Sequence, residues 1–320
     1  MKRYMHSTAL LIVLVLMTGL LAGAAAENKG YIIEENPGKN QNSYPYRIIS
    51  DSAVLYLGRA DIELLGEEAF YAGLDLIMAS METDFTQARE TLKDYLKEGL
   101  LPVSIYTDFA GKAEESQIFP AYYYDAQRGI RLFKGWTAAG ANLLHEYVHY
   151  LTDACVTFSV TTGFWAEGIA EYISRLACEN SMAKAVHYGI PDAAAAFMIA
   201  HGAGDAEGKP DYRKMYYGTA AAYGLPVNVG FEYFAVCNSR MKLTDRQLEH
   251  PMMTSVAYEE AACFIEYLIT RFGQDFVFTH MNCDHAAFAD VYGIRFEDLF
   301  NEWKQENLKK CAELGLQLYE

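Results

Sequence analysis

Two histidines and a glutamate form the most informative short pattern in the chain. His145, Glu146 and His149 lie within residues 144–149, where the spacing of apolar side chains predicts a helix. Side chains four residues apart project from one face of a helix, so the two imidazoles can bind a single zinc ion. Glu146 would then reach a water on that metal. The pattern therefore predicts a hydrolytic zinc site.

A third zinc ligand is expected from a second helix, because a catalytic zinc takes three protein ligands and leaves a position for water. Glu167 is the candidate, since residues 164–178 carry apolar side chains at helical spacing that would pack against the first helix. Glu171 lies one turn later on the same face. Two buried carboxylates repel each other unless a cation is near, and Glu171 would accept the free N–H of a ligand histidine. The alternative is a solvated acidic face paired with Arg175.

Two motifs follow each other along the chain, His145-Glu146-x-x-His149 and Trp165-x-Glu167-Gly168-x-Ala170-x-Tyr172. They resemble the signatures of the gluzincin superfamily of zinc metallopeptidases, closest to its aminopeptidase-like branch. The resemblance implies an α+β fold in which a small mixed β-sheet subdomain precedes a mostly α-helical zinc-binding and C-terminal lobe. It also implies one Zn²⁺ per chain, bound by the two histidines and Glu167, with Glu146 as the catalytic base.

Further residues take expected roles through the resemblance. Asp153, four residues after His149, resembles an acidic position that supports the site in thermolysin-like enzymes, as does Glu171. Tyr258 lies in the helical pattern 256–268, where aminopeptidase-like gluzincins carry a tyrosine that donates a hydrogen bond to the developing oxyanion. The residues after Tyr258 depart from the usual Lys-Gly, and a plain packing role is the alternative.

The stretch just before the zinc helix bears on the substrate. Aminopeptidase-like gluzincins carry a Gly-x-Met-Glu-Asn sequence there, whose glutamate grips the free amine of the substrate. Residues 133–140 contain no carboxylate, so cleavage inside a peptide or a narrow processing role is expected rather than typical aminopeptidase activity. In gluzincins the edge strand of the sheet binds extended substrate. Residues 129–133 are the candidate by position, with an ordinary interior strand as the alternative.

The remaining pattern predicts short strands and helices on both sides of the motifs. The expected strands are 53–57, 102–106, 121–124 and 129–133, and the expected helices are 61–81, 85–96, 256–268, 288–292 and 296–308. One metallopeptidase domain over 47–310 would comprise a sheet-containing part (47–135), the zinc-binding helices (136–180), an insert (181–250) and C-terminal helices (251–310).

The N-terminus has the pattern of an export signal. Lys2 and Arg3 precede an apolar run over 9–21, and three alanines at 24–26 offer a cleavage site. A signal peptide over 1–26, followed by an exposed lead-in over 27–46, predicts a secreted protein without other membrane association. The alternative is an uncleaved N-terminal anchor that holds the domain outside the cytoplasm.

Charge and cysteine content narrow the class of partner. Removal of the signal segment would take the formal net charge from −16 to −18, which disfavours binding to nucleic acid and to anionic membranes. The expected partner is a peptide or protein substrate. The six cysteines could form disulfides outside the cell or remain buried thiols, and the sequence does not specify a pairing.

The expected function is a secreted zinc metallopeptidase that hydrolyses peptide bonds through a zinc-activated water, with Glu146 transferring the proton. Two alternatives stay open: a non-catalytic extracellular binding protein on a peptidase scaffold, and a zinc amidohydrolase that acts on cell-wall peptide. Glu146 argues against the first, because a structural zinc site has no need of a general base.

Overall fold

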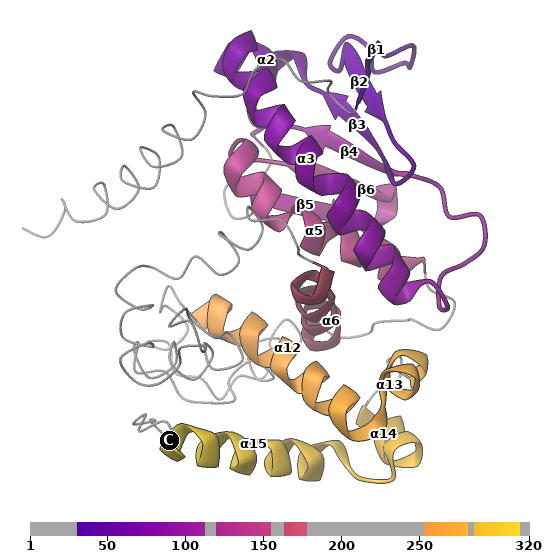
Figure 1. The fold of residues 1–320 in the computed structure, drawn as a ribbon, viewed down its shortest axis with the longest axis vertical. Helices are drawn as coiled ribbons and strands as arrows, with labels where there is room; N and C mark the ends of the chain where they lie inside the picture. The colour runs from indigo at the N-terminus through magenta and orange to yellow at the C-terminus, as the bar shows by residue number, and fades with distance from the viewer. Residues whose placement is uncertain (1–30, 113–119, 155–162, 178–252, 281–284, 314–320) are drawn as a thin grey trace, which may run out of the picture. The chain divides into compact units, whose positions relative to one another are not determined.

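The computed structural model describes residues 31–112, 120–154, 163–177, 253–280 and 285–313. In these residues a six-stranded mixed sheet is combined with helices (Figure 1), which confirms the expected α+β content. The predicted signal peptide and the predicted insert over 181–250 lie outside the described residues.

The sheet has the strand order β1-β2-β3-β4-β6-β5. Its central strands β3, β4 and β6 are parallel to one another, whereas β1 and β2 on one side and β5 on the other pair antiparallel with their neighbours. The bounds are β1 Ile33–Glu35, β2 Tyr46–Ile49, β3 Ala53–Leu57, β4 Val103–Thr107, β5 Ala121–Tyr124 and β6 Gly129–Leu132.

The predicted strands 53–57 and 121–124 match β3 and β5, and the other two are within one residue of β4 and β6. Residues 129–133 were the candidate edge strand, with an interior strand as the alternative, and the structure agrees with the alternative because β6 lies between β4 and β5. The chain reaches the edge first in β5 and then turns back through a short 3₁₀ helix, Asp125–Gln127, to insert β6 beside β4. Strands β1 and β2 were not predicted, and β1 is exposed throughout.

Two helices connect the parallel strands β3 and β4, α2 (Arg59–Leu65) and α3 (Glu67–Leu92). Gly66 separates them with a φ of 79°, a left-handed conformation that glycine adopts without strain. The predicted break between 81 and 85 is wrong. Helix α3 continues through this stretch because Met81, Asp84 and Phe85 are all buried, so the polar residues there do not mark a solvent-exposed end.

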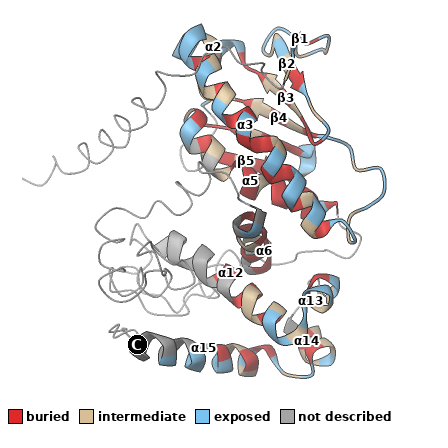
Figure 2. Cartoon of the chain, viewed as in Figure 1, coloured by how far each residue is buried: buried red, intermediate tan, exposed pale blue. Residues whose placement is uncertain are grey.

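Helix α5 (Trp136–Asp153) packs against α3, against the strands β5 and β6, and against α6 (Gly163–Ala177). Helix α6 also packs along α12 (Met253–Phe272). A Cβ atom at Gly168 would lie 3.0 Å from the backbone oxygen of Ala261, so this glycine permits the close approach of α6 and α12. Figure 2 shows buried residues on α3, α5 and α6, which pack against one another.

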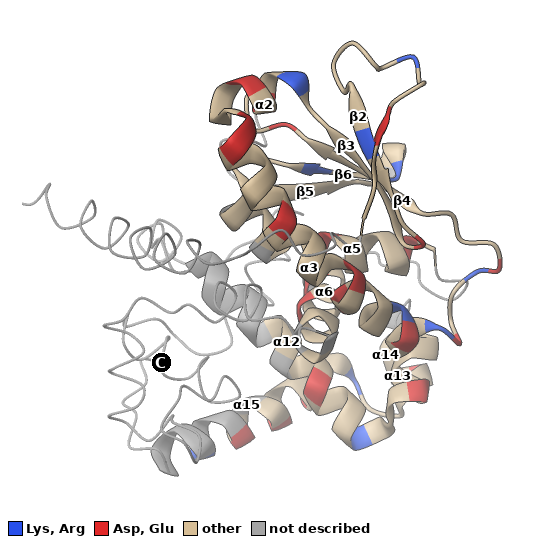
Figure 3. Ribbon diagram, turned by 45° about the horizontal axis from the view of Figure 1, so that its top comes forward, with Lys and Arg blue, Asp and Glu red and all other residues tan. Residues whose placement is uncertain are grey.

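Three further helices follow α12: α13 (Gln274–His280), α14 (His285–Tyr292) and α15 (Phe296–Glu313). The expected turn at Gly293 is present with a φ of 71°, whereas α13 was not predicted. Acidic residues lie on α2, α3 and α15 (Figure 3). Within the described ranges, no helix is both long enough and apolar enough to cross a membrane. All six cysteine side chains lie outside the described residues.

Candidate metal centre

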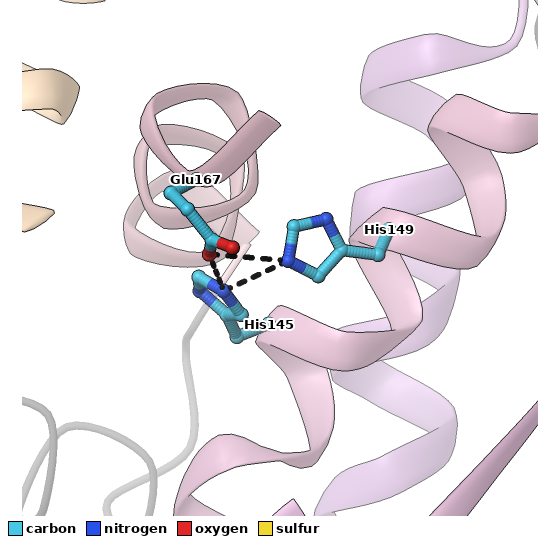
Figure 4. Close-up of side chains that lie close together, drawn as sticks. All are labelled: His145, His149 and Glu167. Atoms are coloured by element: carbon cyan, nitrogen blue, oxygen red, sulfur yellow. Dashed lines mark hydrogen bonds and ion pairs between the residues drawn. The ribbon is translucent and has the colours of Figure 1, made fainter. Parts of the chain in front are cut away.

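Two helices bring the predicted zinc ligands together. His145 and His149 lie one turn apart on α5, and Glu167 lies in the first turns of α6, which packs against α5. The three side chains point toward one another across the helix contact (Figure 4). Among the described residues they form the one group of His, Cys, Asp or Glu side chains whose donor atoms converge in this way.

The donor atoms form a compact triangle. His145 Nε2 lies 2.9 Å from Glu167 Oε2, His149 Nε2 lies 3.3 Å from the same oxygen, and the two Nε2 atoms are 3.1 Å apart. In a tetrahedral zinc site with bonds of about 2.0–2.1 Å, neighbouring ligand atoms are about 3.3 Å apart. The triangle is therefore slightly smaller than a zinc site, and a movement of a few tenths of an ångström would accommodate the ion.

Glu171 lies where it can fix the tautomer of His145. Its Oε2 atom lies 3.2 Å from His145 Nδ1, and both side chains are buried. Since a carboxylate accepts, Nδ1 donates and a neutral imidazole then carries a lone pair on Nε2. That lone pair faces the Glu167 carboxylate and the second imidazole. A metal cation, or a proton on one of the two Nε2 atoms, would stabilise this arrangement.

The pKa shifts of His145 and Glu167 also indicate that the site favours a positive charge. Burial alone would lower the pKa of His145, but its hydrogen bonds to Glu167 and Glu171 raise that pKa well above its ordinary value. Burial would raise the pKa of Glu167, yet His149 and His145 hold it far below its ordinary value. The site thus favours a positive charge next to an ionised Glu167, which either a proton or a metal cation supplies.

Glu146 lies next to the triangle and is held by the edge strand. Its Oε2 atom accepts a hydrogen bond of 2.8 Å from the backbone N–H of Tyr123 on β5. Burial raises the pKa of Glu146 above its ordinary value, an effect that His145 and His149 partly offset. A carboxylate with a raised pKa, beside a site for a cation, is suited to accept and return a proton.

The described contact of the predicted site residue Asp153 is not with the triangle. Asp153 ends α5, and its Oδ2 atom accepts a hydrogen bond of 2.8 Å from the hydroxyl of Tyr123. Tyr258 lies on α12, but its side chain is outside the described residues. Tyr123 itself was predicted only as part of a strand. In a strand over 121–124, Tyr123 lies on the same face as Ala121. The sequence does not indicate that this face packs against α5.

We expect Glu171→Gln to weaken zinc binding by about tenfold, because the amide keeps an acceptor for His145 but loses the charge that increases the basicity of its Nε2. Competition with a chromogenic chelator measures this affinity. The matched control is Glu90→Gln, since Glu90 is an exposed residue of α3 that pairs with Lys93. Equal zinc affinity in the Glu171→Gln and control variants would contradict the role of Glu171.

Comparisons of the chain with protein-family models, with curated proteins and with solved structures find no match. The geometry of the residues is therefore the basis for any statement about function.

Proposed function

We propose that the chain is a zinc-dependent peptidase of the gluzincin type. The observation that carries this proposal is the convergence of His145 Nε2, His149 Nε2 and Glu167 Oε2 within 3.3 Å of one another. A structural zinc site is closed by four protein ligands, whereas the group found among the described residues offers three. A three-ligand set beside a half-buried glutamate is the arrangement that zinc hydrolases use.

The residues of the site would have different roles in hydrolysis. His145, His149 and Glu167 would hold the ion, and Glu171 keeps His145 in the tautomer that presents Nε2. When bound, zinc polarises the scissile carbonyl and lowers the pKa of an attacking water. Glu146 would accept a proton from the attacking water and donate it to the leaving amine. Tyr258 remains our candidate donor to the oxyanion, a contribution of about 3 kcal/mol for one such donor.

The edge strand β5 suits an extended substrate. Phe133 N–H donates to the carbonyl of Pro120, so residues 120, 122 and 124 face β6 and residues 121 and 123 face outward. The outward groups of β5 lie beside Glu146, since Tyr123 N–H already contacts its carboxylate. An extended peptide that pairs with this edge would bring its backbone close to the proposed base.

The proposal extends to substrate type and location. The chain between β6 and α5 has no carboxylate to bind a free amine, which favours cleavage inside a peptide over removal of N-terminal residues. The predicted signal segment favours action outside the cell. Both statements rest on the sequence pattern.

Hydrolysis of a panel of internally quenched peptides tests the function, with purified residues 27–320 supplied with zinc. We expect cleavage at internal bonds, loss of activity with a chelator and recovery when zinc is restored. Cell-wall peptide fragments belong in the same panel. If only these fragments are cleaved, the chain is an amidohydrolase of the cell wall. If neither class is cleaved by protein that holds one zinc per chain, the catalytic proposal is wrong.

A further inference from the structure

Strand β5 is attached to helix α5 at two points that both involve Tyr123. The strand lies at the edge of the sheet, and Tyr123 directs its backbone N–H away from β6. That N–H donates to Glu146 Oε2 at 2.8 Å, and the Tyr123 hydroxyl donates to Asp153 Oδ2 at 2.8 Å. Glu146 and Asp153 lie on the same helix, two turns apart.

The two hydrogen bonds, Tyr123 and the segment of α5 between Glu146 and Asp153 form a closed loop. It runs from Glu146 to the backbone of Tyr123, through its side chain to Asp153, and back along α5. The Tyr123 ring is buried and packs edge-on against Tyr150, with ring centroids 6.2 Å apart. Because the helix and the ring are both rigid, the hydroxyl contact limits the movement of the N–H that holds Glu146.

The carboxylate of Glu146 needs such a support. The glutamate side chain has three rotatable bonds, and a general base must lie within hydrogen-bond reach of the proton that it abstracts. One Glu146 oxygen accepts a hydrogen bond from the strand, so the position of the carboxylate depends on the strand. A strand that shifts along α5 would carry the carboxylate with it, and small displacements of catalytic groups reduce rates severely.

We propose that Tyr123 and Asp153 are positioning residues for Glu146, with Asp153 acting through the Tyr123 hydroxyl rather than on a zinc ligand. This inference rests on the proposed function insofar as Glu146 is the base. It adds that the strand expected to bind substrate and the base are fixed by the same residue.

Kinetics of Tyr123→Phe, Asp153→Ala and the double variant test the link. Each single change should lower kcat about tenfold, the cost of one hydrogen bond to a charged group, with KM and zinc content little changed. The double variant should lose no more than either single variant, because both remove the same contact. Tyr122→Phe is the matched control, since it removes a hydroxyl from the neighbouring residue, which points to the other face of the sheet.

Amide hydrogen exchange gives a readout that does not depend on activity. The amide of residue 123 points away from β6 and donates to Glu146, so its protection in the zinc-loaded wild type reports this bond. We expect this exchange to accelerate about tenfold in Tyr123→Phe, in Asp153→Ala and in Glu146→Ala. The amides of residues 122 and 124, which face β6, should keep their wild-type rates in all three variants.

The outcomes separate the two proposals. Unchanged exchange at residue 123 in both Tyr123→Phe and Asp153→Ala would overturn the positioning role, whether or not the chain cleaves peptides. Additive losses of kcat in the double variant would overturn it as well. Accelerated exchange in protein that cleaves no substrate would support the link between β5 and α5 and contradict the proposed hydrolysis.

Discussion

Glu146→Gln should reduce peptide hydrolysis by about 10³-fold, the usual contribution of a general acid–base group, while the zinc content stays at one per chain. The amide keeps an oxygen that can accept the N–H of Tyr123, so β5 and α5 should retain their contact. It cannot accept and return a proton. The loss should appear in kcat, because proton transfer belongs to the chemical step rather than to binding.

The comparison needs metal analysis by mass spectrometry beside the kinetics, so that loss of chemistry is distinguished from loss of the ion. Glu90→Gln serves as control because Glu90 is an exposed glutamate on α3, far along the chain from either zinc motif. Full turnover by Glu146→Gln would remove Glu146 from the mechanism. Loss of both zinc and activity would instead assign Glu146 to the metal site.

The His145, His149 and Glu167 cluster could be predicted from the sequence because each half of it is local. His145 and His149, like Glu167 and Glu171, are four residues apart, and helical geometry alone places each pair on one face. Apolar spacing on both helices indicated that these faces meet the core. The structure brings the two pairs together without any further requirement, since α6 packs directly against α5.

The surroundings of the site were not readable, since they depend on the order of strands in space. The candidate edge strand was β6, but the hairpin places β5 outside it and so sets Tyr123 against Glu146. Asp153 was expected to support the zinc ligands by its position after His149. Its described contact is with Tyr123, a residue 30 positions earlier in the chain. Such contacts follow from sheet register, which no short pattern encodes.

Helix ends show the same limit. The predicted break fell between 81 and 85, whereas the real break is at Gly66. Asp84 is only 4% exposed, so a polar residue here belongs to the core. A glycine with a positive φ ends α2 for a local conformational reason. In this chain Gly66 therefore marks the helix end, whereas the polar residues at 82–84 do not.

The second large effect concerns the third ligand. Glu167→Ala should abolish stoichiometric zinc binding, because the two remaining ligands come from a single turn of α5 and α6 no longer contributes. Changes in groups that only support ligands cost about 10–100-fold in metal affinity, so loss of a ligand should cost more. We therefore expect wild-type protein to hold close to one zinc per chain at micromolar zinc and the variant to hold almost none.

Folding should survive the Glu167→Ala change, which is why metal content is a clean measurement. The Glu167 side chain is 23% exposed, so alanine leaves no closed cavity. Loss of the carboxylate also removes a partner that stabilises positive charge on His145. Glu90→Ala is the control for loss of an acidic side chain. A Glu167→Ala variant that binds zinc as tightly as wild type would show that a different group completes the site. Wild-type protein that binds no zinc at all would leave His145, His149 and Glu167 as an acid-histidine cluster and refute the peptidase proposal at its first step.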